Sequence, residues 1–293
     1  MINWPENLID AVARRRCVLF LGSGISANSC NEGGKRPATW ETFLKDILTK
    51  RERKLDIHKV VIERLLGEKD YLTACEIIMD VIGENDFSEL VAEEFRRPGY
   101  KTSDVHREIY RLDSRLVITP NVDKIYEQYA ISESNSTIVV KSYYEDDVAK
   151  YLRTNDYLII RAHGHVDDTS KMVFTHKQYS IARCKYSAFY KLLDALILTH
   201  TFVFLGCGIS DPDIQLTLEN SNFLYPSSRP HYFITADGAY EPEIANVLSH
   251  NRNLELLTYE NPDGTHANLL VALQELNQKV EANRKIIMDN QTW

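Results

Sequence analysis

The sequence predicts a doubly wound (Rossmann-like) α/β fold, in which helices cover both faces of a parallel sheet. Seven short runs of apolar residues recur along the 293 residues, and their hydrophobicity is continuous rather than alternating. Strands that are covered on both faces show this pattern. Helical patterns separate the runs, and strands that alternate with helices are typical of a parallel α/β sheet.

The predicted strands are rich in β-branched and aromatic residues. They span 17–21, 115–119, 137–141, 157–162, 201–206, 231–235 and 254–257. Phe189, Leu193 and Ile197 recur at helical spacing before the fifth strand, and Leu269 and Leu273 do so near the C-terminus. Each set predicts an amphipathic helix that packs against the sheet.

A helical insert interrupts the alternation after the first strand-helix unit. Trp40, Phe43 and Ile47 lie on one helical stripe, and Thr39 is placed to cap that helix. Further helical patterns follow at 60–66, 72–82 and 87–95. We expect one domain over residues 1–293, with the insert at about 35–105.

Composition narrows the class of protein. With 34 Lys and Arg against 42 Asp and Glu, the net charge is −8, so we expect no direct nucleic-acid binding. The net charge leaves one alternative, which is a local basic groove. No apolar run reaches the ~20 residues of a membrane helix, and the first residues lack the pattern of a secretion signal, which predicts a cytoplasmic protein. The five cysteines contain no C-x-x-C pair, which argues against a disulfide framework or a structural zinc site. We expect most of them to be small core residues.

The first motif is the glycine turn at the end of the first predicted strand. It runs Gly22-Ser23-Gly24-Ile25-Ser26. Glycines at such a turn let the backbone approach a pyrophosphate, and the helix that follows presents free N–H groups. The third glycine of the dinucleotide motif is absent, and a G-x-G turn also occurs without a ligand.

The second motif follows the next strand, where open α/β sheets bind their ligands. Asn121 offers a donor and an acceptor, which suits a ribose hydroxyl or an attacking water, and Asp123 could face a cationic pyridinium. Alternatively, Asp123 caps a helix that starts at Lys124, and Asn121 only closes the turn.

The third motif is His163-Gly164-His165, at the end of the predicted 157–162 strand. A histidine next to a glycine at a strand end is placed to exchange protons near neutral pH. A structural role for His163 stays open, and so does metal binding by both histidines, although no further ligand stands at a helpful local spacing.

The fourth motif is a second glycine turn, after the 201–206 strand. It contains Gly206 and Gly208, followed by Ser210 or Asp211 as a helix cap and Pro212 in the first turn. Two glycine turns on two strands could hold the two halves of a dinucleotide.

These four segments, in this order, resemble the sirtuin-like NAD hydrolase family of bacterial antiviral defence systems. The likeness extends from Val18 to His266. It implies an enzyme that cleaves NAD to nicotinamide and ADP-ribose and depletes NAD during antiphage defence by abortive infection. It implies that Asn121 and His163 are the catalytic residues. The NAD-binding positions that it implies are Gly22, Ser23, Gly24, Ser26, Asp123, Gly206, Gly208, Ser210 and Asp211.

The sequence departs from sirtuin deacylases, because it lacks their four zinc-binding cysteines and their Pro-Asp-Phe-Arg-like segment. We therefore expect NAD as a substrate, with no zinc and no other cofactor. An NAD or ADP-ribose sensor without turnover, and a protein deacylase or ADP-ribosyltransferase, stay as alternatives. The resemblance further implies a homo-oligomer and a separate regulatory partner, such as a HerA-like ATPase or an Argonaute-type protein.

Overall fold

A seven-stranded parallel sheet forms the centre of the computed structural model, which describes residues 2–208 and 211–292. The strand order is β3-β4-β2-β1-β5-β6-β7. The strands are β1 (Cys17–Leu21), β2 (Leu116–Thr119), β3 (Val139–Ser142), β4 (Leu158–Arg161), β5 (Thr201–Leu205), β6 (His231–Ala236) and β7 (Leu254–Tyr259). The predicted fold class is confirmed, and all seven predicted strands are present, with ends displaced by at most two residues.

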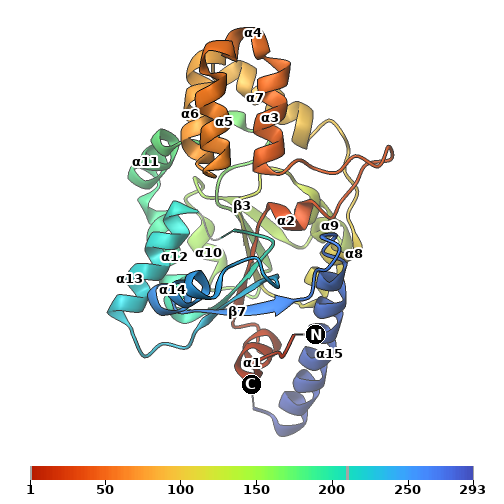
Figure 1. The fold of residues 1–293 in the computed structure, drawn as a ribbon. Helices are drawn as coiled ribbons and strands as arrows, with labels where there is room; N and C mark the ends of the chain where they lie inside the picture. Colours follow the sequence, from red (N-terminus) through yellow and green to blue (C-terminus); the bar gives the residue numbers. More distant parts are fainter. Residues whose placement is uncertain (1, 209–210, 293) are drawn as a thin grey trace.

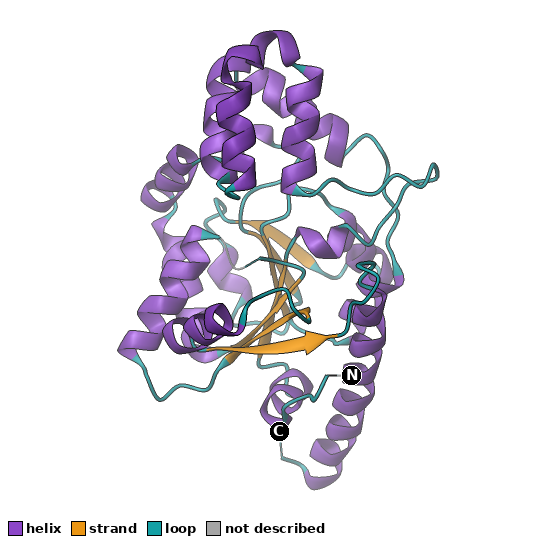
Figure 2. Ribbon diagram, in the orientation of Figure 1, coloured by secondary structure: helices purple, strands orange, loops and turns teal. Residues whose placement is uncertain are grey.

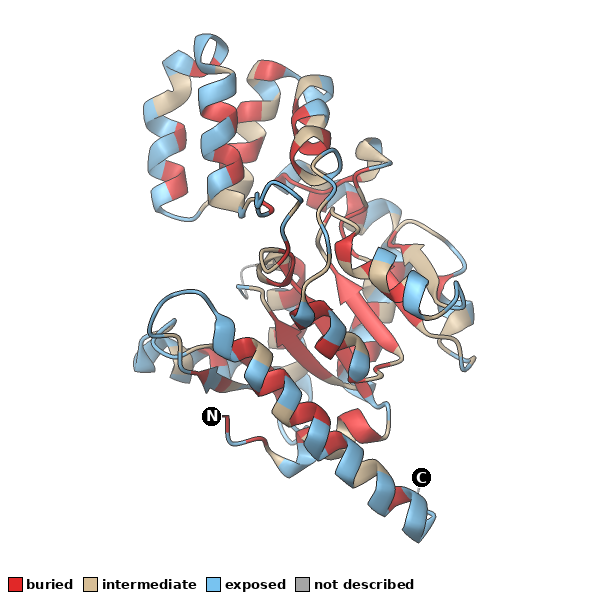
Figure 3. Cartoon of the chain, turned by 90° about the vertical axis from the view of Figure 1, so that its right-hand side faces the viewer, coloured by how far each residue is buried: buried red, intermediate tan, exposed pale blue. Residues whose placement is uncertain are grey.

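Helices cover both faces of the sheet (Figures 1 and 2). On one face pack α1 (Glu6–Ala13), α8 (Asp104–Arg111), α9 (Ile125–Glu133) and α15 (Ala267–Asn290). On the other lie α10 (Val148–Tyr151), α11 (His176–Lys185), α12 (Ser187–Thr199) and α13 (Pro212–Leu224), with α14 (Pro242–Arg252) beside α13. Along β1, Leu19 and Leu21 enter the first core, whereas Val18 and Phe20 enter the second. Both faces of the central strands are therefore buried, as Figure 3 shows, which explains their continuous hydrophobicity.

The insert between β1 and β2 contains α3 (Trp40–Lys50), α4 (Glu52–Leu55), α5 (Lys59–Gly67), α6 (Tyr71–Ile82) and α7 (Glu84–Phe95). These helices form a separate group at the top of Figure 1, with a core of their own. Thr39 caps α3 as predicted, because its hydroxyl accepts the N–H of Thr42 at 3.3 Å. The predicted helical patterns at 60–66, 72–82 and 87–95 correspond to α5, α6 and α7. That residues 1–293 form one domain stays a prediction.

The insert core also contains side chains from the loops that follow β2 and β4. Val122, from the first loop, and Phe174, from the second, are buried in it. The Phe174 ring lies edge-on to Trp40 of α3 at 5.4 Å and to Phe87 of α7 at 5.3 Å. The insert therefore packs against the carboxyl end of the sheet.

The cysteines differ from the prediction, although all five are free thiols. Cys17 and Cys75 are buried, but Cys30 and Cys184 are exposed and Cys207 is partly exposed. The expectation that most are core residues is wrong, because Cys30 lies in a surface loop and Cys184 lies on the exposed side of α11. Among the residues that the structure describes, no helix combines the length and the apolar character needed to cross a membrane.

Candidate active site at the carboxyl edge of the sheet

The two glycine turns, after β1 and β5, pack directly against each other. The Gly22 N–H donates to the Leu205 carbonyl at 2.9 Å, and the Gly24 N–H donates to the Gly206 carbonyl at 2.7 Å. A Cβ at Gly22 would lie 2.4 Å from the Cys207 Cβ, and one at Gly24 would lie 2.7 Å from the Gly206 oxygen. Contacts this short exclude any side chain, so turn-to-turn packing requires glycine at both positions.

This packing bears on the predicted phosphate loop. The N–H groups of Gly22 and Gly24 are already engaged, and the helix that follows, α2 (Ser23–Ser26), has only four residues. Gly208 is exposed after the second turn, whereas the predicted site residue Ser210 lies outside the described residues. Phosphate binding by these turns stays a prediction.

The second motif joins the first through side-chain hydrogen bonds. The Ser26 hydroxyl donates to the Asp123 carboxylate at 2.8 Å, and the Asn121 amide donates to the Ser26 oxygen at 3.1 Å. The second oxygen of Asp123 accepts the N–H of Ile125, the first residue of α9, at 3.0 Å. Asp123 therefore also supports the helix start, one residue later than predicted. Burial raises the pKa of Asp123, although the Ile125 and Ser26 hydrogen bonds oppose this.

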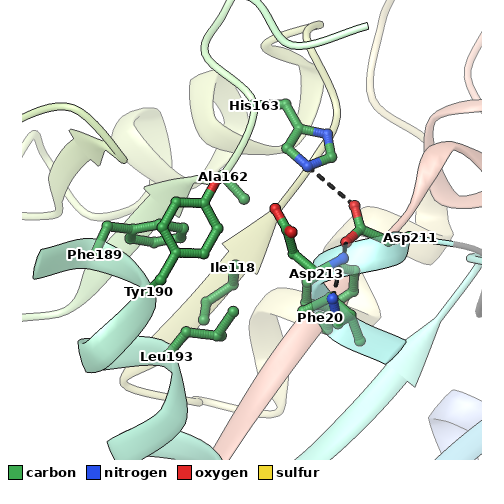
Figure 4. Close-up of a pocket in the computed structure, with 10 residues that line it drawn as sticks. Phe20, Ile118, Ala162, His163, Phe189, Tyr190, Leu193, Asp211 and Asp213 are labelled. Carbon is green, nitrogen blue, oxygen red and sulfur yellow. Dashed lines mark hydrogen bonds and ion pairs between the residues drawn. The ribbon is translucent and has the colours of Figure 1, made fainter. Parts of the chain in front are cut away.

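His163 belongs to a second polar group, drawn with its surroundings in Figure 4. Its Nε2 lies 3.0 Å from a carboxylate oxygen of Asp211 and 3.1 Å from the Tyr179 hydroxyl. The Tyr179 hydroxyl also donates to that oxygen of Asp211, at 2.8 Å. Burial alone would raise the pKa of Asp211, but the charge and hydrogen bond of His163 hold it below its ordinary value. The histidine ring is thus fixed against an ionised carboxylate.

Asp211 has a structural task as well. Its other carboxylate oxygen accepts the N–H groups of Asp213 and Ile214, each at 3.0 Å, with Pro212 in the first turn of α13. The predicted cap is confirmed at Asp211. One carboxylate therefore fixes both the start of α13 and the ring of His163. That Asp211 also contacts NAD stays a prediction.

Gly164 explains how the chain turns away after His163. Its φ is +77°, and a Cβ there would lie 2.5 Å from the Lys171 carbonyl oxygen. The next histidine, His165, has different neighbours: its Nε2 lies 3.5 Å from the Tyr144 hydroxyl, and its Nδ1 lies 3.9 Å from Asp167. His163 and His165 therefore contact separate partners, and burial lowers the pKa of His165.

The Asn121 and His163 segments lie side by side at the same end of the sheet. They follow the neighbouring strands β2 and β4, whose last paired residues are Thr119 and Arg161. Beyond the strands, the Ala162 N–H donates to the Thr119 carbonyl at 2.8 Å, so the two segments stay together past the sheet. Both predicted catalytic residues thus occupy one edge, although they belong to different hydrogen-bonded groups.

A small cavity lies beside His163. It measures about 10 Å³, which is room for about one water. Asp213 and Tyr190 contribute polar groups to it, and Asp213 is paired with Arg183 at 2.9 Å. Burial raises the pKa of Asp213. The full lining consists of Phe20, Ile118, Ala162, His163, Phe189, Tyr190, Leu193, Asp211, Asp213 and Ile214.

Sequence reasoning missed Tyr179, Tyr190 and Asp213. Tyr179 and Tyr190 lie on the helices α11 and α12, far from any glycine turn, and only the packing of these helices brings them to His163. Asp213 stands two residues after the predicted cap Asp211. Its place in the first turn of α13 was the one signal that pointed towards it.

The fold and the site define a doubly wound α/β protein with paired glycine turns and an Asn–His pair at the carboxyl edge of its sheet. Comparison with known families refines this class, because residues 115–257 match the SIR2-like domain. The predicted resemblance to sirtuin-like NAD hydrolases of antiviral defence is confirmed by this match and by the following relatives.

Relatives with this character come from several bacteria. The NAD(+) hydrolase ThsA of Enterococcus faecium is 26% identical over 261 residues, which cover 84% of this chain and 51% of that protein. The enzyme of the same name from Bacillus cereus (strain MSX-D12) is 23% identical, over 81% of this chain and 47% of that protein. Defense-associated sirtuin 2 of Bacillus subtilis is 25% identical, over 64% of this chain and 19% of that protein. The chain therefore spans about half or less of the length of these relatives.

Proposed function

We propose that this protein is an NAD glycohydrolase that cleaves NAD to nicotinamide and ADP-ribose. The observation that carries the proposal is the placement of Asn121 and His163 on neighbouring strand ends, with the His163 ring fixed by Asp211 and Tyr179. Two of the relatives are named NAD(+) hydrolases, which supports the same reaction.

In the proposed reaction, a water oxygen attacks C1′ of the ribose while the bond from C1′ to the pyridinium nitrogen breaks. Nicotinamide leaves as a neutral molecule with the electron pair of that bond, so positive charge develops on the sugar in the transition state. Asn121 orients the ribose and the water through its amide. His163 accepts the proton of the water, directly or through a ribose hydroxyl.

Asp211 and Tyr179 act on the reaction through His163. The carboxylate stabilises the imidazolium that forms when His163 accepts a proton, and it keeps the ring in one orientation. The Tyr179 hydroxyl donates to this carboxylate and so fixes the carboxylate in turn. Both are positioning residues in this proposal.

NAD is the substrate, bound between the glycine turns and the 121–123 segment, with no zinc and no other cofactor. The proposed NAD contacts are the positions assigned to it from the sequence, from Gly22 to Asp211. The cavity beside His163 holds only about one water, so a dinucleotide either lies outside this cavity or displaces its lining side chains. A site closed in this way agrees with an enzyme that stays inactive until it is triggered.

The cellular role that we propose is NAD depletion during antiphage defence by abortive infection, in the cytoplasm. In this proposal the protein forms a homo-oligomer, and a separate protein, such as a HerA-like ATPase or an Argonaute-type protein, controls its activity. We propose that one domain carries this activity, with the helical insert as the surface that contacts the regulator. The similarity to a defence-associated sirtuin supports the role.

The test is nicotinamide release from NAD by purified protein, alone and with candidate partners, followed by chromatography. We expect Asn121→Ala and His163→Ala to abolish release. His250→Ala, at an exposed position near the end of α14 and outside the insert, is the matched histidine control and should retain the wild-type rate. Full activity in either site variant would refute the assigned roles. NAD binding with no release under any condition would identify a sensor instead, and release that depends on an acyl-lysine peptide would identify a deacylase.

A further inference from the structure

A basic concavity lies at the amino end of the sheet, opposite the candidate active site. Arg16 directly precedes β1, Arg115 directly precedes β2, and His200 directly precedes β5. The concavity measures about 490 Å³. In Figure 1, α1, which leads into it, lies at the far end of the molecule from the insert. Its lining residues are Arg14, Arg15, Arg16, Arg115, Asn155 and His200.

Positive charge in this concavity is only partly compensated. Arg14 pairs with Asp10 at 2.8 Å, and Arg15 pairs with Asp113 at 2.6 Å. Within the described ranges, Arg16 and Arg115 form no ion pair. Two guanidinium groups thus share one concavity without carboxylate partners, in a chain whose net charge is −8.

Hydrogen bonds hold this cluster in place. The Arg115 guanidinium donates to the carbonyls of Leu152 and Thr154, each at 2.9 Å, and so anchors one side of the concavity. The Arg16 carbonyl accepts the N–H of Thr201 at 3.0 Å, so its backbone is tied to the start of β5. A guanidinium has five donors in a planar fork, so Arg115 retains donors beyond these two bonds.

The arginine charges also affect the pKa of the neighbouring His200. Burial lowers the pKa of His200, and the positive charges of Arg115 and Arg16 lower it further. Both guanidinium groups are therefore close enough to His200 for their charge to repel its protonated form. A bound anion would relieve that repulsion and bring the guanidinium groups the partners that they lack.

We propose that this concavity binds a small anion that carries two or more linked phosphate groups, such as inorganic pyrophosphate or the diphosphate of a nucleotide. Guanidinium forks match the oxygens of a phosphate group in two-point contacts. The volume of about 490 Å³ lies within the ~300–1,000 Å³ of small-molecule sites. A nucleic acid is disfavoured, since the net charge of −8 repels a long polyanion.

Isothermal titration at constant ionic strength tests the proposal, with pyrophosphate and ADP as separate probes. We expect saturable binding of pyrophosphate, with an affinity that falls about tenfold or more in Arg16→Gln and less in Arg16→Lys, because the lysine keeps the charge. Arg16 is exposed, so its replacement leaves the fold intact, which a thermal unfolding curve checks. Arg53→Gln, an exposed arginine of the insert, is the matched control and should bind as the wild type does.

The two probes separate the sources of the phosphate groups. Equal affinity for both supports recognition of the linked phosphates alone, whereas binding of ADP only, weakened by Arg16→Gln, supports a nucleotide ligand. The proposal is overturned when neither probe saturates or when Arg16→Gln binds as tightly as the wild type. A single-stranded oligonucleotide serves as a third probe, and binding of the oligonucleotide alone also overturns the proposal.

The candidate active site provides an internal control. Asn121→Ala should leave pyrophosphate binding unchanged, since Asn121 lies at the other end of the strands. Loss of binding in Asn121→Ala would place the anion at the carboxyl edge and overturn the proposal. The titration needs no NAD turnover, so failure of the proposed hydrolase activity would leave its outcome intact.

Discussion

Asp211→Asn probes the contact between the carboxylate and His163. The substitution removes a negative charge 3.0 Å from the histidine Nε2 and keeps the size of the side chain. Hydrogen bonds to charged groups contribute about 1.5–3 kcal/mol and neutral ones about 1 kcal/mol. The difference of about 0.5–2 kcal/mol in the transition state lowers kcat about 2- to 30-fold. Because Asp211 contacts the ring that accepts the proton, we expect kcat to fall. An additional rise in KM would report the proposed contact of Asp211 with NAD.

The assay is steady-state nicotinamide release, together with thermal unfolding of each variant. Asparagine caps helices about as well as aspartate does, so the start of α13 should survive the change. Asp70→Asn is the matched control, because Asp70 also caps a helix, α6, by accepting the Thr73 N–H at 3.2 Å. We expect wild-type kinetics in that control. A kcat for Asp211→Asn within about twofold of wild type, or an increase confined to KM, would refute the reasoning.

Three further predictions concern stability, measured by urea unfolding. Ser26→Ala removes a hydrogen bond from the partly buried Asp123 carboxylate and should cost about 1–3 kcal/mol. Ser29→Ala, at a buried hydroxyl with no partner in the described residues, should cost little, and equal losses would contradict this. Gly164→Ala should cost about 1–3 kcal/mol or more, because its φ is +77° and the new Cβ would overlap the Lys171 carbonyl; a neutral change would show that the turn relaxes freely. Burial lowers the pKa of His231 from 6.5 to about 4, so the unfolded chain binds a proton that the folded chain does not, and stability should fall by up to about 3 kcal/mol as the pH drops through this range. His231→Gln should reduce that fall, and an unchanged pH profile would contradict the assignment.

The inner strands were predictable because they are buried on both faces, and a continuous apolar run is the direct result of that environment. The edge strands β3 and β7 are partly exposed, and their shorter apolar runs gave the less accurate ends. Thr39 and Asp211 were predictable as caps because capping is local and depends on residues two or three positions away. The cysteines were harder, since exposure depends on which side of a helix or loop faces solvent. Cys184 lies in α11, which packs against the sheet, but on the side of that helix that faces solvent.

The pairing of His163 with Asp211 was not predictable from spacing. These residues follow β4 and β5, and β2 and β1 lie between those strands in the sheet. Tyr179 reaches them from a helix, so its position depends on how α11 packs against the sheet. The glycine turns were found correctly, and contact with the second turn already requires glycine at Gly22, a reason that the sequence did not reveal.

The burial of Val122 and Phe174 in the insert core limits how the insert can be exchanged in protein engineering. Since both side chains lie in its core, the backbone on either side of Val122, including Asn121, depends on how the insert folds. Deleting the insert would remove the apolar side chains against which the loops after β2 and β4 pack. Chimeras with related proteins should therefore exchange the insert and these two loops as one unit.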